Sequence, residues 1–426
     1  MAIIEEGVCK IESINSKGMG VGVSNYGAVE LPCASIGDVV RFERHRYRNR
    51  TNCVLVEVLE EGPYKQQPAC KYFARCGGCQ LQHLLESDYI RLKVDMLKTP
   101  LAKFGISCKV KEPIFVSKAS RRRANFEAVK RQEGVLFGFH RFHSNHIVNI
   151  DNCPALLPNL SNLISPLAQM LDQILDLKQK AQIFLTQGAN GVDLTLEIYR
   201  QPRLSLEQRE HLLEFAARYN LIKLTFRAKK FIDIVHLQEE PFVLFDQVPV
   251  GIDAHCSLQA SSQSDQILQN LVLSYASYIH PGNKVVDLFC GRGTYTLPLS
   301  KDYIVDGYES DPKAIAALRD ASIKAGRSIE LYTRDLFQKP LDAQELNKYS
   351  FAVLNPPRAG AQSQVKALAA SQVASIVYIS CNPETFAADA QILLAENYQL
   401  VEVTPFDQFY WSAHLELVGY FTRSKI

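Results

Sequence analysis

The C-terminal part of the chain alternates strand-like and helix-like segments, and this pattern constrains the fold more than any other feature. After about residue 258, apolar runs such as KVVDLF and FAVLNPP are separated by segments with helical spacing. Strands that alternate with helices form parallel βαβ units, which build an open doubly wound sheet. We therefore predict a Rossmann-like α/β domain over residues 259–426.

Two further domains are expected before it, because 426 residues are too many for one ordinary core. Residues 1–62 alternate apolar and polar positions between turn signals, which predicts a small OB-like antiparallel β-barrel. Residues 63–258 begin with a helical stretch and continue rich in strands, which predicts a central α+β domain. Small barrels are frequent oligonucleotide platforms, although a fold alone assigns no function.

Composition limits where the protein acts. A hydrophobic content of 47% with 22% charged residues is typical of a folded domain, and no apolar run reaches membrane-spanning length. The N-terminus lacks the charged and apolar regions of a signal peptide, so we expect a cytoplasmic protein. In a reducing compartment, eleven cysteines with a tight cluster indicate a metal or catalytic site rather than disulfides.

The net charge of +2 gives little support for nucleic-acid binding, but two basic runs do. The segment 41–50 has five arginines against one glutamate, and the segment 118–132 has six basic residues around Phe126. Arginines interleaved with aromatic rings suit contacts with phosphates and bases in RNA. A solvated charged surface is an equally good interpretation of these runs alone.

A series of strand ends forms the expected cofactor site. The turn after KVVDLF contains Gly291 and Gly293, which allow a ligand close to the backbone. The turn is not GxGxxG, and no lysine follows it, which weakens the dinucleotide and triphosphate alternatives. Glu309, Asp335 and Asn355 follow the next strands. Polar groups at successive strand ends favour a nucleoside carrying a sulfonium, S-adenosylmethionine, although single strand-end acids are often helix caps.

A thiol and a carboxylate are expected at the same edge of the sheet. Cys381 follows the apolar strand VYIS, and His414 and Glu416 are predicted two apart on one face of a C-terminal strand. A thiolate that adds to carbon 6 of a uracil makes carbon 5 nucleophilic, and a base must then remove the carbon 5 proton. We assign Cys381 as nucleophile and Glu416 as base. A packing role for His414 is favoured over a catalytic one.

At these residues the chain resembles the RNA uracil-5 methyltransferase family, in its iron–sulfur branch with an N-terminal TRAM domain. The resemblance covers nearly the whole chain. It rests on the segments CKYFARCGGCQLQH, RRRANF, DNCPAL, SLQASSQ, DLFCGRGTYTLPLS, LNPPRAG, SCNPETFAAD and HLELVGYF.

The resemblance implies two bound groups and an RNA surface. Four cysteines would hold a four-iron four-sulfur cluster, whereas spacing alone also suits zinc: Cys70, Cys76, Cys79 and Cys153. The expected S-adenosylmethionine contacts are Gln259, Asp287, Gly291, Gly293, Tyr295, Glu309, Asp335 and Asn355. The expected RNA contacts are Arg123, Phe126, Arg358 and His414.

Two positions depart from the family pattern. Asn355 replaces the usual aspartate of the DPPR motif, and Ser261 replaces the usual asparagine two residues after Gln259. The lost charge at Asn355 bears on rate and substrate, while the methyltransferase prediction stands.

The sequence leaves several functions open. We expect methylation of uridine carbon 5 in structured RNA by a monomer, with 23S rRNA favoured and tRNA as an alternative. An amino-group methyltransferase is suggested by NPPR, but such sites follow NPP with an aromatic residue where this chain has Arg358. A catalytically inactive RNA-binding or chaperone homologue is a third possibility, for which Asn355 is the only indication.

Overall fold

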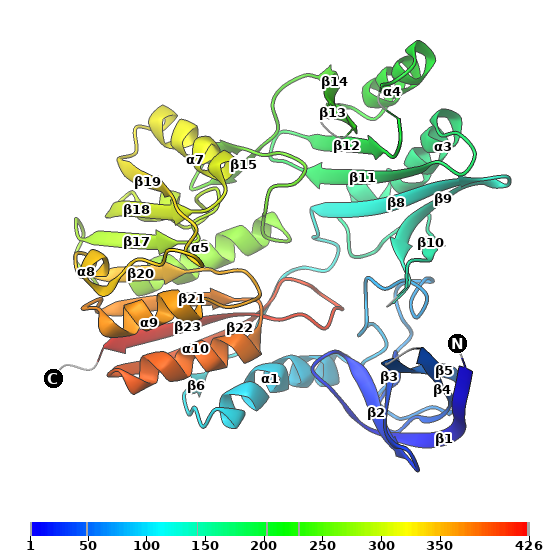
Figure 1. The fold of residues 1–426 in the computed structure, drawn as a ribbon, viewed down its shortest axis with the longest axis horizontal. Helices are drawn as coiled ribbons and strands as arrows, with labels where there is room; N and C mark the ends of the chain where they lie inside the picture. Colours follow the sequence, from blue (N-terminus) through cyan, green and yellow to red (C-terminus); the bar gives the residue numbers. More distant parts are fainter. Residues whose placement is uncertain (1, 48–49, 143, 202, 229–230, 424–426) are drawn as a thin grey trace.

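The computed structural model describes residues 2–47, 50–142, 144–201, 203–228 and 231–423, which form three main sheets (Figure 1). The N-terminal sheet is antiparallel with five strands in the order β3-β2-β1-β4-β5. The strands are β1 (Ala2–Ile14), β2 (Met19–Ser24), β3 (Gly27–Pro32), β4 (Val39–Tyr47) and β5 (Arg50–Glu60). The sheet curls around a small apolar core that includes Ile11 and Phe42. In the described pairings β3 and β5 are its edges, so the expected barrel is a curled sheet here.

The central sheet has seven strands in the order β10-β9-β8-β11-β12-β13-β14. They are β8 (Arg123–Arg131), β9 (Gly134–His140), β10 (Ile147–Asn149), β11 (Lys180–Gln187), β12 (Val192–Ile198), β13 (Leu221–Ala228) and β14 (Phe231–Leu237). Helices α2 (Pro158–Ser161), α3 (Ile164–Ile174) and α4 (Leu206–Arg218) pack on it. Ser205 and Gln208 form a capping box that starts α4. These elements enclose one apolar core.

The C-terminal sheet has nine strands, ordered β19-β18-β17-β20-β21-β23-β22-β6, with β7 also paired to β22. Its strands are β6 (Lys109–Val110), β7 (Ile114–Phe115), β17 (Lys284–Leu288), β18 (Ile304–Glu309), β19 (Ile329–Thr333), β20 (Phe351–Leu354), β21 (Ser375–Ser380), β22 (Tyr398–Asp407) and β23 (Glu416–Arg423). Strands β20 and β21 are buried along their whole length, which explains their uninterrupted apolar sequences.

Helices cover this sheet as predicted for a doubly wound fold (Figure 1). They are α5 (Ser262–Ala276), α6 (Thr296–Leu299), α7 (Pro312–Lys324), α8 (Ala343–Leu346), α9 (Gln362–Ala370) and α10 (Pro383–Ala395). A separate hairpin, β15 (Phe242–Phe245) with β16 (Val248–Gly251), packs on α7. In the described part of the chain, no helix combines the length and apolarity needed to cross a membrane.

Two features differ from the expected arrangement. Helix α1 (Glu86–Lys103) packs on α10, and β6 and β7 pair with β22, although the sequence places residues 86–115 in the central domain. Two-residue strands are too short to show a period, so only pairing reveals them. In addition, β23 is antiparallel to β21 and β22, because the connection of residues 408–415 contains no crossover helix.

Candidate active site

The register of β21 and β23 brings the predicted thiol and carboxylate together. Ser380 at the end of β21 pairs with Leu417 near the start of β23. In an antiparallel pair the next residue outward on one strand faces the preceding residue on the other, so Cys381 lies opposite Glu416. Cys381 is half-buried, and Glu416 keeps only 6% of its surface exposed.

The two side chains influence each other's charge. Burial raises the pKa of Cys381, the Glu416 carboxylate raises it further, and Arg358 lowers it. The pKa of Glu416 is raised to about 7, chiefly by burial, while a hydrogen bond from Gln408 lowers it. A carboxyl group with a pKa near neutrality can exchange a proton at physiological pH, as a general base requires. The sequence analysis did not identify Gln408.

The glycine turn after β17 provides open space beside a carboxylate. Gly291 has a φ of +54°, and nothing lies within 4 Å of the position where its Cβ would be. Gly293 has a φ of +93°, and a Cβ there would lie 2.3 Å from Leu318 Cδ1. Both backbone conformations favour glycine, and at Gly293 a side chain would also clash with Leu318. The backbone N–H of Gly291 donates to Glu309 Oε2 at 3.0 Å, which places Glu309 at the turn as predicted.

Asp287 lies beneath this turn and has an unsatisfied oxygen. Its Oδ2 accepts a hydrogen bond from the Thr296 hydroxyl at 2.6 Å, whereas the buried Oδ1 has no partner among the described residues. Burial raises the pKa of Asp287 to about 7. Tyr295 is also buried, and its hydroxyl accepts a hydrogen bond from Gln259 Nε2 at 3.5 Å. A buried acceptor without a partner fits a ligand that donates hydrogen bonds.

The remaining strand-end residues are placed as expected. Asp335 follows β19, and its Oδ1 accepts a hydrogen bond from the Phe337 N–H at 2.9 Å. Asn355 follows β20 directly, and its N–H donates to the Leu288 carbonyl at 3.3 Å. Ser261 is the N-cap of α5 and accepts the Ser264 N–H at 3.1 Å. Since serine and asparagine are both good N-caps, this departure from the family pattern preserves the helix start.

The four predicted cluster cysteines line one cavity of about 210 Å³. Its other walls are largely apolar and include Phe73, Phe139 and Ile150. The pKa of Cys79 is raised to about 12, first by burial and then by the other three thiols. The Tyr72 N–H donates to Cys70 Sγ at 3.4 Å and the Gly78 N–H to Cys76 Sγ at 3.5 Å. Among the described residues, no three acidic, histidine or cysteine side chains converge as a single metal ion needs.

The two expected RNA contacts of β8 have different positions. Phe126 is fully buried and packs against Phe137 and Phe139, with ring centroids 4.9 Å and 4.7 Å away. The expectation that Phe126 contacts RNA is therefore wrong, because strand alternation turns its ring into the core. Arg123 points the opposite way. Its guanidinium donates to the Ala254 carbonyl at 2.9 Å and to the Cys256 carbonyl.

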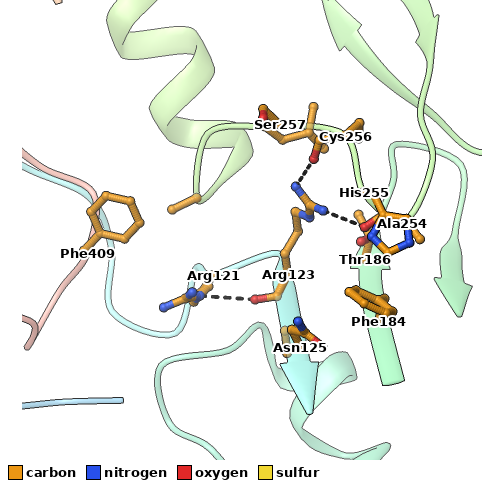
Figure 2. A pocket seen from close by; sticks show the side chains of 13 residues that line it. Arg121, Arg123, Asn125, Phe184, Thr186, Ala254, His255, Cys256, Ser257 and Phe409 are labelled. Carbon is orange, nitrogen blue, oxygen red and sulfur yellow. Dashed lines mark hydrogen bonds between the residues drawn. The ribbon is translucent and has the colours of Figure 1, made fainter. Parts of the chain in front are cut away.

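Arg123 lines an open pocket of about 460 Å³ between the central sheet and the C-terminal domain. Figure 2 shows Arg121, Asn125, Phe184 and His255 around it, with Phe409 on the far side. Phe184 and His255 form an edge-to-face pair with centroids 4.5 Å apart. The pocket thus combines cationic, amide and aromatic groups next to the loop that leads to Glu416.

His414 and Arg358 lie near the reacting pair. His414 precedes β23 and is exposed, whereas Glu416 is buried, so the two do not share one face of a strand. The pKa of His414 is lowered by partial desolvation, by Arg358 and by two further cations, although the ring is exposed. Arg358 is exposed, and its carbonyl accepts a hydrogen bond from Asn382 Nδ2 at 3.1 Å.

The basic runs are partly engaged within the fold. Arg44 contacts Glu5 at 2.6 Å, and Arg41 pairs with Glu57. Arg48 and Asn49 of the first run lie outside the described residues. In the second run, Arg122 forms a buried ion pair with Asp265 at 2.7 Å. Part of this charge therefore joins elements of the fold rather than covering its surface.

Comparisons with known proteins find RNA methyltransferases among the relatives of this chain. Residues 328–424 match the family model described as tRNA (Uracil-5-)-methyltransferase. An uncharacterised RNA methyltransferase of Brucella suis is 33% identical over 427 residues, covering 100% of both chains. The 23S rRNA (uracil(1939)-C(5))-methyltransferase RlmD of Haemophilus parainfluenzae is 30% identical and covers 98% of this chain and 96% of its own.

A solved structure has a similar fold. The tRNA (uracil-54, C5)-methyltransferase of Pyrococcus abyssi, in complex with S-adenosyl-L-homocysteine, superimposes with a TM-score of 0.72. It is 22% identical, and the match covers 98% of this chain and 100% of the archaeal one.

Proposed function

The chain belongs to the RNA uracil-5 methyltransferase family, and from this premise we propose that it methylates carbon 5 of a uridine in 23S rRNA. The observation that carries the proposal is Cys381 opposite Glu416 at the edge of a methyltransferase sheet. The choice of 23S rRNA is supported by the Haemophilus relative, which matches nearly the full chain. tRNA is the second candidate, since the archaeal protein with a similar fold is a tRNA (uracil-54, C5)-methyltransferase.

In this proposal Cys381 supplies the nucleophile. Its thiolate sulfur forms a bond to carbon 6 of the uracil, and the electrons of the C5–C6 double bond move to carbon 5 and the adjacent carbonyl. Carbon 5 then forms a bond to the transferable methyl group, and the electrons of the broken methyl–sulfur bond neutralise the donor sulfonium. Arg358 favours the thiolate, because its charge lowers the pKa of Cys381.

Glu416 completes the reaction as the base. Its carboxylate takes the proton from carbon 5, the electrons of that C–H bond restore the C5–C6 double bond, and the bond from carbon 6 to Cys381 breaks to return the thiolate. The raised pKa of Glu416, about 7, makes it a stronger base than an exposed glutamate while leaving much of it ionised at neutral pH.

S-Adenosylmethionine supplies the methyl group when bound. We assign its site to the turn at Gly291 and Gly293, with Glu309 and Asp335 at the strand ends and Gln259 beside them. The open space at Gly291 and the unpaired oxygen of Asp287 fit a ligand of this kind. Tyr295 and Asn355 complete the proposed contacts.

We also propose a four-iron four-sulfur cluster held by the four thiols around the 210 Å³ cavity: Cys70, Cys76, Cys79 and Cys153. The four thiols around one cavity would supply the Cys₄ ligand set of such a cluster. N–H groups directed at Cys70 and Cys76 are the hydrogen bonds expected around cluster sulfurs. At this position the cluster would have a structural role. For residues 1–62 we propose RNA binding like that of a TRAM domain.

RNA is proposed to reach Cys381 past the pocket of Figure 2, where Arg121 and Arg123 supply positive charge and Phe184 an aromatic surface. Arg358 and His414 would contact it nearer the reacting base. We also propose that the protein is cytoplasmic and acts as a monomer. An inactive RNA-binding homologue is disfavoured, because such a protein has no need of Cys381 opposite a buried Glu416.

A covalent-trap experiment tests the function. The protein is incubated with S-adenosylmethionine and 23S rRNA containing 5-fluorouridine, and protein–RNA adducts are separated on a denaturing gel. Fluorine cannot leave carbon 5 as a proton, so the adduct should accumulate. It should disappear in Cys381→Ala or without S-adenosylmethionine, and persist in the control Cys108→Ala. If an RNA that the protein binds gives no adduct, uracil methylation by this route is excluded; an adduct with tRNA alone would identify the other substrate.

A further inference from the structure

Gln408 connects the proposed base to the proposed cofactor contact. It lies between β22 and β23, and its side chain is buried. Gln408 Nε2 lies 3.0 Å from Glu416 Oε1 and 2.7 Å from Gln259 Oε1. Gln408 Oε1 accepts a hydrogen bond from the Ala260 N–H at 2.9 Å. One amide therefore contacts two adjacent residues before α5, Gln259 and Ala260, and the first residue of β23, Glu416.

The chemistry of these groups fixes the orientation of the amide. The Ala260 N–H can only donate, so the atom facing it must be the oxygen of Gln408. The two N–H bonds of Gln408 then face Glu416 and Gln259, and an ionised carboxylate can only accept. Since Gln259 Oε1 receives one of these bonds, the amide nitrogen of Gln259 is turned toward Tyr295. Gln408 thus sets which end of Gln259 is available to a ligand.

The backbone around Gln408 is held by helix α1. Lys93 is fully buried, lies 3.1 Å from Asp407 Oδ1 and donates to the Ser412 carbonyl at 2.9 Å. The Tyr89 hydroxyl accepts the Trp411 N–H at 2.9 Å. These bonds attach the segment that connects β22 and β23 to α1 on both sides of Gln408. The position of Gln408 is therefore supported by tertiary contacts with α1.

We propose that Gln408 is a positioning residue that holds the Glu416 carboxylate and the Gln259 amide in fixed relative positions, so that proton removal and methyl-donor binding are coupled through one side chain. This rests on the proposed function. One Glu416 oxygen receives the Gln408 bond, and no described residue donates to the other, Oε2, which remains for the proton of carbon 5. Gln408 acts through the two side chains that it contacts, Glu416 and Gln259.

The test replaces the amide and keeps the volume. Gln408→Met removes a hydrogen bond that favours the charged form of Glu416, so the pKa of Glu416 should rise and the acid limb of turnover should move up by about one pH unit. The KM for S-adenosylmethionine should rise several-fold through Gln259. Adduct formation with 5-fluorouridine RNA at saturating S-adenosylmethionine should be retained, since it precedes proton removal. General loss of structure would reduce adduct formation and turnover together.

The control is Gln364→Met, the same change at a buried glutamine that bonds only to the backbone of Leu341. It should leave the pH profile and the KM unchanged. An unchanged pH profile and KM in Gln408→Met would overturn the proposal. If that variant does not fold, Gln408→Asn retains an amide that is too short to reach Glu416 and should shift the limb in the same direction.

A second readout does not depend on turnover. Infrared difference spectra of the intact protein report the carboxyl titration of Glu416, identified by its loss in Glu416→Gln. The titration of Glu416 should move to higher pH in Gln408→Met and stay unchanged in Gln364→Met. If the wild-type protein gives no adduct that requires Cys381, the function fails and this inference fails with it. If the adduct forms and the titration does not move, only the role of Gln408 is wrong.

Discussion

Ser380 pairs with Leu417 across β21 and β23, and this pairing makes Cys381 and Glu416 neighbours although 35 residues separate them in the chain. The strand pairing therefore holds the two proposed reacting groups next to each other within the fold. Preorganisation of this kind lowers the cost of reaching the transition state.

Glu416→Gln should stop the reaction after methyl transfer. The amide cannot accept the carbon 5 proton, so methylated RNA should remain bonded to Cys381 and turnover should fall by about 10²- to 10⁴-fold. Denaturing gels with ordinary, unfluorinated RNA and labelled S-adenosylmethionine would detect the adduct. Free methylated RNA at the normal rate would show that another group is the base.

Turnover should increase with pH across the neutral range. Glu416 must be ionised to act, and because its pKa is raised to about 7, activity should be lost as the pH falls through that value. Cys381 must also be ionised, and burial raises its pKa, so adduct formation should continue to increase on the alkaline side. Both groups act in their deprotonated forms, so the ionisation of each makes activity increase with pH. Initial rates between about pH 6 and pH 9 measure the profile; an acid optimum would contradict it.

Cys153→Ser should lower the iron content and the yield of folded protein. Cys153 lines the cavity with the other three thiols, and loss of one ligand exposes a cluster to solvent and to loss of iron. Iron and sulfide analysis of anaerobically purified protein measures this effect. Cys108→Ser, at a half-buried cysteine outside the cavity, is the matched control. Equal iron in both variants would remove Cys153 from the ligand set.

Removing one partner of the Arg122–Asp265 ion pair should destabilise the protein. Burial raises the pKa of Asp265 to about 6 despite the nearby guanidinium, which shows that desolvation outweighs the attraction. Asp265→Ala leaves a buried cation unpaired and should cost about 3–5 kcal/mol in the free energy of unfolding. Urea unfolding measures it.

An exposed ion pair provides the comparison. Lys103 contacts Glu384 at 3.1 Å on the surface, so Lys103→Ala should cost no more than about 1 kcal/mol. The double variant Arg122→Met with Asp265→Leu should lose less stability than Asp265→Ala alone, because no buried charge remains. If Asp265→Ala and Lys103→Ala lowered the free energy of unfolding equally, the buried ion pair would be no more important for stability than the exposed one.

The sequence determined the parts of this protein that depend on local pattern. The alternation of apolar runs and helical spacing gave the doubly wound domain, because side-chain periodicity follows directly from backbone geometry. It also located the glycine turn, since glycine adopts positive φ angles without steric cost. The chemistry of their residue types and the family resemblance predict Cys381 and Glu416 as the reacting pair.

Only the tertiary structure decided how distant segments meet. The antiparallel entry of β23 beside β21 put Glu416 opposite Cys381 and left His414 outside the strand. Phe126 is predicted to face RNA but lies in the core. Side chains of a strand alternate between its two faces, so Phe126, three residues after Arg123, lies on the opposite face. Gln408 has no motif that marks it. The role proposed for it rests on hydrogen bonds to Gln259 and Glu416, and such contacts arise only when three-dimensional packing brings remote residues within about 3 Å.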